Sequence, residues 1–220
     1  MNLGELKAIV RRRLDDTKKK YEWSDADVVL YLNKAEQEAC RRARLITDSS
    51  TEEICRMSVV SGESLFEFDP RILYIRRLKL STETVTLQKW RREDLDATEP
   101  GWEDTTGDIT RWCPNYETGK IRWIYTPTAA ATVNATVIRL PLQDMVANED
   151  VPEIKPHLHL SLVHGALFYL YQNAEIDQRD DTRMAENGDL FTSEFGPPVT
   201  GHHELFMHER YGYDEFEGLY

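Results

Sequence analysis

Apolar residues recur at helical spacing at the start of the chain. The first stripe consists of Leu3, Leu6, Val10 and Leu14. Its intervals of three and four residues predict a helix over residues 3–16, with Arg11 on the opposite, polar face. Ser24, followed three residues later by Asp27, is typical of a helix N-cap, so a second helix is predicted over residues 24–44. Its alanines permit close helix–helix contact, and the two helices are expected to form a hairpin.

After residue 50 the pattern changes to short runs of β-branched and aromatic residues. Strands are predicted over residues 54–60, 65–68, 72–80, 84–87, 109–113, 120–125 and 132–140. The last of these alternates most clearly, because Val133, Ala135 and Val137 lie between polar residues. Residues 91–98 read as a short helix or turn. The regular spacing of short strands indicates a small antiparallel β-sandwich or barrel.

Helical spacing returns after residue 150. A helix over residues 157–174 is apolar nearly all round, which is typical of a buried helix, and a last helix is predicted over residues 182–195. The expected fold class is therefore α+β. Residues 1–50 and 151–198 are expected to form one helical bundle, because helices of both ends need a common core. Residues 51–150 are then an inserted β domain.

Two segments look suited to contacts with partners. Residues 99–108 begin with a Pro-Gly turn and stay polar, which predicts an exposed contact loop made by Trp102, Glu103 and Asp104. Residues 199–220 are aromatic and acidic with no lasting period, so they are either disordered or an extended arm. The expected anchors of that arm are Tyr211, Tyr213, Phe216 and Tyr220, because aromatic side chains bury a large area at modest entropic cost.

Charge and hydropathy narrow the functional class. The 220 residues carry a formal charge of −12, and it is uneven. Residues 1–44 hold 11 Lys and Arg against 8 Asp and Glu, whereas residues 151–220 hold 4 against 13. Tight, general binding of nucleic acid relies on Lys and Arg, so an acidic chain is a poor candidate for it. No run of apolar residues reaches membrane-spanning length, and no contact with a membrane is expected.

The residues that usually carry chemistry are scattered. The three cysteines, Cys40, Cys55 and Cys113, lack CxxC spacing and are expected to be reduced thiols. The histidines of the buried helix, His157, His159 and His164, lack the i, i+4 pairing of a helical zinc site. The carboxylate pairs Asp15-Asp16, Asp25/Asp27 and Asp180-Asp181 lie at helix ends, where capping explains them. No catalytic residue, metal or cofactor is expected, and the chain is predicted to be structural and not an enzyme.

An alternative function rests on the tryptophans of the β region. Trp90, Trp102, Trp112 and Trp123 would form a platform for a ligand in a carbohydrate- or protein-binding β module with helical flanks. The competing interpretation assigns the same four side chains to the core and turns of the sheet.

Several short segments, taken in order, resemble a known family. They are residues 2–6 (NLGEL), 23–25 (WSD), 119–127 (GKIRWIYTP), 139–141 (RLP), 151–154 (VPEI) and 162–171 (LVHGALFYLY). This order is similar to that of the head-to-tail adaptor proteins of tailed bacteriophages, the connector or tail tubular family. The resemblance covers roughly residues 2–195 and is one of element order, without a catalytic motif.

The resemblance implies a ring of twelve copies under the portal protein, around a channel through which DNA passes without specific binding. The implied partners are other copies of the chain, the portal and the tail nozzle or tail tube protein, with tail fibres as an open alternative. The arm would then bind the portal or a neighbouring subunit. An acidic channel wall would repel phosphates and let DNA slide. The implied location is the neck of the virion, after assembly in the host cytoplasm.

Overall fold

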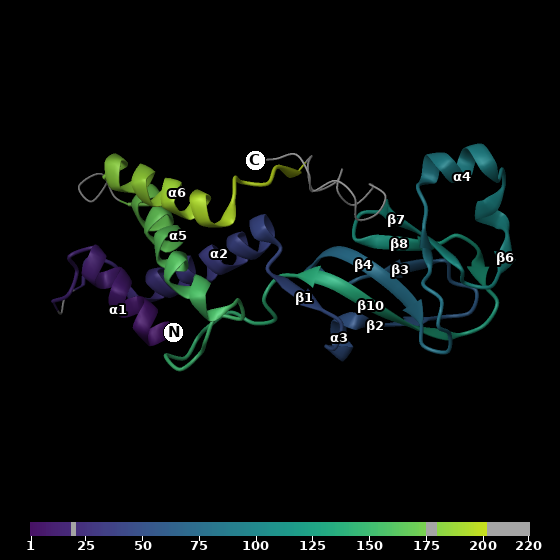
Figure 1. The fold of residues 1–220 in the computed structure, drawn as a ribbon, viewed down its shortest axis with the longest axis horizontal. Coiled ribbons are helices and arrows are strands. Elements are labelled where there is room, and N and C mark those ends of the chain that lie inside the picture. The colour runs from purple at the N-terminus through teal and green to yellow at the C-terminus, as the bar shows by residue number, and fades with distance from the viewer. Residues whose placement is uncertain (19–20, 175–179, 202–220) are drawn as a thin grey trace. The chain divides into compact units, whose positions relative to one another are not determined.

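The computed structural model describes residues 1–18, 21–174 and 180–201 (Figure 1). The chain divides into two compact units. The helical unit contains residues 1–46 and 139–199, and the β unit contains residues 47–138. The α+β class is confirmed. Residues 139–150, which the sequence pattern assigned to the β part, belong to the helical unit.

The helical unit is built around one buried helix. Its elements are α1 (Leu3–Arg13), α2 (Asp25–Ala43), the 3-10 turn η2 (Pro156–Leu158), α5 (His159–Gln172) and α6 (Asp181–Phe195). Helix α5 packs against α1, α2 and α6, as Figure 1 shows, and its residues Leu162, Val163, Ala166 and Leu170 have no accessible surface. The prediction of a buried helix is therefore confirmed. Helix α5 is apolar nearly all round because it packs against three neighbouring helices.

Local side chains set where the helices begin. Asn2 and Glu5 form a reciprocal capping box at the start of α1. The Ser24 hydroxyl oxygen accepts from the Asp27 backbone N–H at 3.0 Å, which confirms the predicted N-cap of α2. Asp180 caps α6 in the same way through the Arg183 N–H. These caps satisfy amides that have no partner inside the helix, so each start is encoded within four residues.

Helix α5 approaches its neighbours most closely at Gly165. A Cβ atom at this position would lie 2.7 Å from Cε2 of Phe191 in α6 and 2.8 Å from Cβ of Ala35 in α2. Real carbon–carbon contacts are not this short, so only glycine fits without movement of a neighbour. The small residues Gly165 and Ala35 thereby bring the backbones of α5 and α2 together.

Buried polar groups hold the segment that precedes η2 and α5 against α2. The Asn33 side-chain amide donates to the Met145 carbonyl and accepts from the Met145 N–H, both at 2.9 Å. The Glu36 carboxylate accepts from the Glu153 N–H at 2.6 Å. The Glu153 side chain in turn pairs with the guanidinium of Arg139. Each bond replaces a backbone partner that this irregular segment lacks.

Glu36 is almost fully buried, with 2% of its surface exposed. The pKa of its carboxyl is raised to about 7, chiefly by burial and also by the nearby carboxylates of Glu153 and Asp144. The backbone N–H groups of Glu153 and Ile154 act in the opposite direction. The carboxyl therefore keeps its proton in the folded chain at a pH where it would lose it in the unfolded chain.

The β unit contains two four-stranded sheets and one strand pair. Its strands are β1 (Ile46–Asp48, which begins one residue earlier), β2 (Arg56–Val59), β3 (Leu65–Glu67), β4 (Ile72–Leu80), β5 (Gln88–Lys89), β6 (Thr106–Gly107), β7 (Arg111–Glu117), β8 (Lys120–Trp123), β9 (Thr126–Pro127) and β10 (Ala131–Arg139). In the first sheet β10 pairs with β1, β2 and β4, and the second has the order β3-β8-β7-β5. The predicted alternation of β10 is confirmed, because Val133, Ala135 and Val137 are buried.

The β unit corrects three expectations. In the described part of the chain the sheets do not close into a barrel, and β5/β7 and β6/β9 pair in parallel. The strand predicted over residues 54–60 begins only at Arg56, and Ile54 and Cys55 belong to the short helix α3 (Glu52–Cys55). The Asp48 carboxylate accepts from the Ser50 and Thr51 N–H groups and turns the chain before this helix. Of the strand predicted over 84–87, only a single bridge from Thr86 to Lys79 forms.

We predict that Gly165→Ala lowers the free energy of unfolding of the helical unit by about 1–3 kcal/mol because the new methyl group overpacks the contact with Phe191 and Ala35. Helix propensity alone predicts the opposite effect, an increase of about 1 kcal/mol in the free energy of unfolding. Denaturant unfolding followed by circular dichroism at 222 nm measures the difference. Gly188→Ala in α6 is the control, because its nearest neighbour is the half-buried Phe168 ring at 3.0 Å, which has room to shift. Equal effects of both substitutions would contradict the close-approach argument.

We also predict a pH dependence of stability that originates at Glu36. Its pKa is about 7 in the folded chain against an ordinary value of 4.5, so its contribution to stability is fully present below pH 4.5 and is lost as pH rises through 7. The resulting loss in the free energy of unfolding between these two pH limits is about 3 kcal/mol. Unfolding titrations between pH 4 and 8 should show this decline in the natural chain and a flatter profile in Glu36→Gln. Glu194→Gln, at an exposed site on α6, should leave the decline intact.

Candidate functional site

The described residues contain no cluster of metal-binding side chains. Among them, no group of three or more His, Cys, Asp or Glu side chains is placed to hold a metal ion. The ring of His159 is buried and bonds to the Ile154 carbonyl and to Met1, and His164 contacts Asn187 and Arg13. Burial lowers the pKa of His164. Within the same described ranges, no helix is long and apolar enough to cross a membrane.

The cysteines are free and buried, as the sequence predicted for reduced thiols. Burial raises the pKa of Cys113 to about 11 and that of Cys40 well above its ordinary value. A nucleophilic cysteine needs a lowered pKa and access to solvent, so neither thiol is prepared for that role. The surfaces of the two units are therefore the places to look for function.

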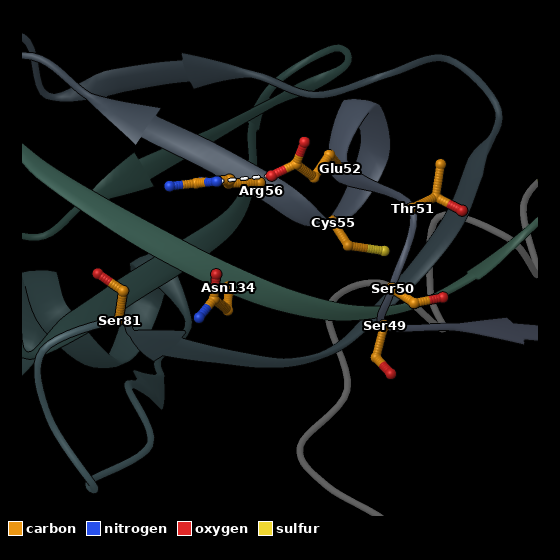
Figure 2. A pocket seen from close by; sticks show the side chains of 8 residues that line it. All are labelled: Ser49, Ser50, Thr51, Glu52, Cys55, Arg56, Ser81 and Asn134. Atoms are coloured by element: carbon orange, nitrogen blue, oxygen red, sulfur yellow. Dashed lines mark hydrogen bonds and ion pairs between the residues drawn. The ribbon is translucent and has the colours of Figure 1, made fainter.

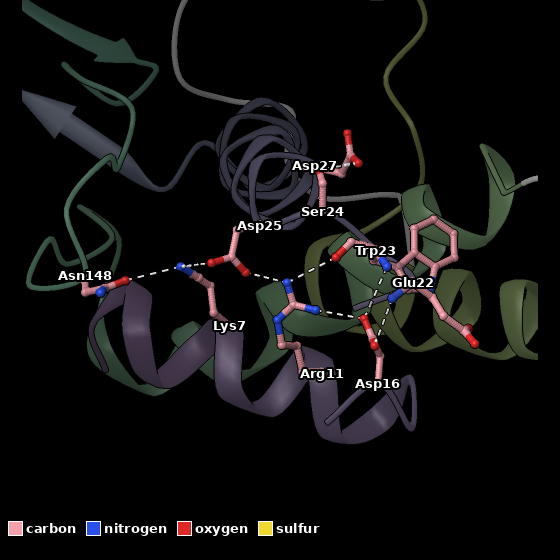
Figure 3. Close-up of polar contacts among 9 residues, drawn as sticks. All are labelled: Lys7, Arg11, Asp16, Glu22, Trp23, Ser24, Asp25, Asp27 and Asn148. Carbon is pink, nitrogen blue, oxygen red and sulfur yellow. Dashed lines mark hydrogen bonds and ion pairs between the residues drawn. The ribbon is translucent and has the colours of Figure 1, made fainter. Parts of the chain in front are cut away.

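A charged network joins the end of α1 to the start of α2 (Figure 3). The buried Arg11 guanidinium donates to Asp16 at 2.8 Å, to the Trp23 carbonyl at 3.2 Å and to Asp25. Asp16 also accepts from the N–H groups of Glu22 and Trp23. The hydrogen bond from Arg11 lowers the pKa of Asp25. The network thus bonds the residues that follow α1 to those that precede α2.

The sequence pattern missed this role of Arg11, which it assigned to the polar face of α1. Only 7% of Arg11 is exposed, and Asp16 is buried beside it. The signal in the sequence was an Arg next to the apolar stripe, five residues before an Asp that follows the end of the helix. A buried guanidinium needs such partners, since an unpaired buried charge is strongly destabilising.

At the other end of α1, a loop over residues 146–151 is bonded to the helix start (Figure 3). The Leu3 N–H donates to the Asp150 carbonyl at 2.7 Å, and the Gly4 N–H donates to the Asn148 carbonyl at 2.9 Å. The Asp150 carboxylate closes the loop by accepting from the N–H groups of Val146 and Ala147. These backbone N–H bonds lower the pKa of Asp150. The loop is thus held from inside and from α1.

A pair of arginines on α2 fixes the chain where it leaves α6. Arg41 donates to the Val199 carbonyl at 2.9 Å, and Arg42 donates to the Gly196 carbonyl at 3.2 Å. Glu38 pairs with both guanidinium groups and orients them. Two prolines, residues 197 and 198, stiffen the segment between these bonds. The position from which the C-terminal segment departs is therefore defined by α2.

The exposed side of α6 is acidic. Its exposed carboxylates are Asp181, Glu186, Asp189 and Glu194. Arg183 is the basic residue of this helix, and it pairs with Asp180 and lies 3.9 Å from Asp15. The opposite side buries Phe191 and Phe195 in the helical core. The helix thus presents net negative charge to its surroundings.

In the β unit, ion pairs and aromatic rings surround α4 (Arg92–Thr98) and η1 (Trp102–Asp104). Arg111 donates to both Glu99 oxygens, at 2.6 and 2.9 Å, and the Tyr125 hydroxyl donates to the same carboxylate at 2.8 Å. The hydrogen bonds from Arg111 and Tyr125 lower the pKa of Glu99 to about 2. These contacts tie the segment after α4 to β7 and to the residue that precedes β9.

The predicted contact loop is partly wrong. Trp102 is 2% exposed, and its indole N–H donates to Asp96 at 2.9 Å, so it belongs to the core with Leu95, Cys113 and Ile124. Glu103 is half-buried and accepts from the Tyr116 hydroxyl, whereas Asp104 is exposed. An aromatic residue after a Pro-Gly turn looked like a surface feature, but the core of the β unit needed its area.

Burial also removes the basis for a tryptophan platform. Trp112 and Trp123 are 2% and 0% exposed, and only Trp90 of the four is partly accessible. A ligand platform requires exposed ring faces, so three of the four side chains are unsuited to it. The alternative of a carbohydrate-binding β module loses its main support.

One hollow of the β unit is small and polar (Figure 2). It encloses about 300 Å³ and is lined by Ser49, Ser50, Thr51, Glu52, Cys55, Arg56, Ser81 and Asn134. Arg56 pairs with Glu52 at 2.6 Å, and the Thr51 and Ser50 hydroxyls donate to Asp48. Because these groups are engaged with one another, the hollow resembles a packed surface turn and not a prepared binding site.

The expected anchors of the C-terminal arm, Tyr211, Tyr213, Phe216 and Tyr220, lie outside the described residues. Their role stays a prediction. The described chain reaches residue 201, so it includes the arginine contacts that precede the arm.

Comparison with known proteins agrees with a role in assembly. A family model described as SU10 adaptor protein matches residues 1–199, which include the described parts of both units. No curated protein matches the chain. Since the match extends over most of the 220 residues, the resemblance to phage head-to-tail adaptors is confirmed. The chain belongs to the SU10 adaptor protein family, and it is a structural, non-enzymatic component of the phage neck that oligomerises and contacts other head and tail proteins.

Proposed function

We propose that this adaptor assembles as a ring of twelve copies that joins the portal to the tail and surrounds the DNA exit channel. The family match over residues 1–199 is the observation that carries the proposal, because it covers both units and identifies an adaptor. The further partners are the tail nozzle or tail tube protein and, as an alternative, tail fibres. The ring is assembled in the host cytoplasm.

The charge of the helical unit supports a channel for DNA. Helix α6 has several exposed carboxylates but a single arginine, and the whole chain carries a formal charge of −12. A wall of this sign repels phosphates, so DNA passes without being retained. We therefore propose that α6 faces the channel. In the β unit, Asp104 and the half-buried Glu103 then remain available for contacts with the tail.

The C-terminal arm is proposed to bind the portal or a neighbouring subunit through Tyr211, Tyr213, Phe216 and Tyr220. Its departure point supports this role, because Arg41 and Arg42 bond the chain at residues 196–199 to α2. A fixed departure point reduces the entropy lost when the arm docks. The sequence that follows supplies aromatic rings, which make strong anchors when a partner groove buries them.

Reversal of the charge of α6 tests the channel. The triple variant Glu186→Lys, Asp189→Lys and Glu194→Lys should still form rings, because these side chains are exposed. It should slow DNA release from particles by about tenfold or more, since lysines attract phosphates. A time course of DNA release measures the effect. Glu53→Lys, Glu63→Lys and Glu83→Lys change the same charge at exposed sites of the β unit and should release DNA normally. Normal release from the α6 variant, or a basic channel in a reconstruction of the assembled neck, would contradict the proposal.

Deletion of residues 200–220 tests the arm. The shortened chain should keep the stability of the natural chain but bind portal particles about a hundredfold more weakly. Cosedimentation with portal particles measures the loss. Replacement of the four aromatic anchors by Ser should reproduce it, whereas Asp214→Asn, Glu215→Gln and Glu217→Gln should not. If the deletion variant binds normally, the arm has no anchoring role.

A further inference from the structure

Two surfaces at opposite ends of α1 differ in charge. The loop surface consists of Asp144, Val146, Glu149 and Val151. The end surface consists of Arg12, Arg13, Lys18 and Tyr21. All eight residues are exposed and belong to the helical unit. Opposite charge on two parts of one rigid unit is a pattern that a contact between copies requires.

The loop surface holds apolar side chains in solvent. Val146 is 81% exposed and Val151 is 57% exposed, and they flank the tight turn that the Asp150 carboxylate closes. Single exposed apolar residues are common. Here, however, the backbone around both valines is fixed by bonds to Leu3 and Gly4. A fixed loop loses little entropy when a partner covers it.

The end surface is also held in place. The Arg11 guanidinium stacks on the Tyr21 ring at 3.6 Å and thereby fixes a side chain that is 43% exposed. Arg13 contacts the ring of His164 at 3.2 Å. Asp15, which follows α1, lies 3.9 Å from Arg183 of the same copy. Tyr21 offers apolar area to match the valines, and Arg12 and Lys18 offer charge to match Glu149.

The two surfaces cannot meet within one copy. Helix α1 has 11 residues and separates them by about 16 Å along its axis. Figure 3 shows Asn148 beside the start of the helix, whereas Asp16 and Trp23 lie beyond its end. We propose that the loop surface of one copy docks on the end surface of a second copy of this chain. Two different surfaces in contact make a heterologous interface, which closes into a ring when the rotation per copy allows it.

This interface rests on the proposed ring and specifies which surfaces form it. Cross-linking of the full-length chain tests it. The double variant Val146→Cys and Lys18→Cys, treated with a short bismaleimide, should give a ladder of covalent oligomers. Each single variant alone should give none, and a mixture of the two should give covalent dimers. The background is low because the native thiols are buried, with Cys40, Cys55 and Cys113 at 0%, 4% and 2% exposed.

The combination Val85→Cys with Lys18→Cys is the matched control, since Val85 is 67% exposed on the β unit, and it should give no ladder. Dimers from Val146→Cys alone would show a symmetric contact and overturn the proposal. An unlinked double variant that still forms oligomers would overturn the interface and leave the ring intact. A natural chain that stays monomeric at every concentration and with portal particles would overturn the ring as well.

Exchange of charge adds a readout that misfolding does not mimic. Glu149→Lys and Lys18→Glu should each weaken association by about tenfold, because attraction becomes repulsion. The chain that carries both substitutions should recover the association of the natural chain. Sedimentation velocity measures the assembled fraction. Failure of the combined variant to recover, with both single variants folded, would show that these residues do not face each other.

Discussion

The contact between α5 and α2 at Gly165 and Ala35 is the constraint on which the rest of the structure depends. It joins the two ends of the chain, because α2 precedes the β unit and α5 follows it. Once these backbones touch, everything between them has to leave the helical core and return to it. The β unit is therefore an insertion in the sequence of the helical unit. The returning segment lacks regular structure, so Asn33 and Glu36 of α2 supply the hydrogen-bond partners that a helix or strand would have supplied.

Charged residues of the helical unit fall into two groups with different physical roles. Arg11, Asp16 and Glu36 are buried, and each is bonded to groups that compensate for lost hydration. The carboxylates of α6 stay in solvent and have few partners of opposite sign in their own helix. Buried charges fix connections between elements, whereas exposed charges determine which surfaces attract or repel. An adaptor needs both, because it has to present surfaces without rearranging them.

The β unit shows how function can be misread from aromatic composition. Its tryptophans look like a ligand platform in the sequence, but three of the four lie in the core. Large rings contribute buried area beside aliphatic side chains, as Trp102 does beside Leu95 and Ile124. The arginines stacked on the remaining rings continue this packing toward the surface, as Arg111 does over Trp90 and Tyr125.

The sequence by itself determined the α+β class, the long helices, the Ser24 cap of α2 and the alternation of β10. These features depend on residues within a few positions of one another, so a local pattern encodes them. Tertiary structure alone decided that Arg11 is buried, that Trp102 is not a surface residue and that residues 139–150 belong with the helices. Each of these depends on a partner far away in the chain, and no local pattern contains it. The sequence pattern did not predict short strands such as β1 and β9 for the same reason. Two or three residues become a strand only when a neighbouring strand pairs with them.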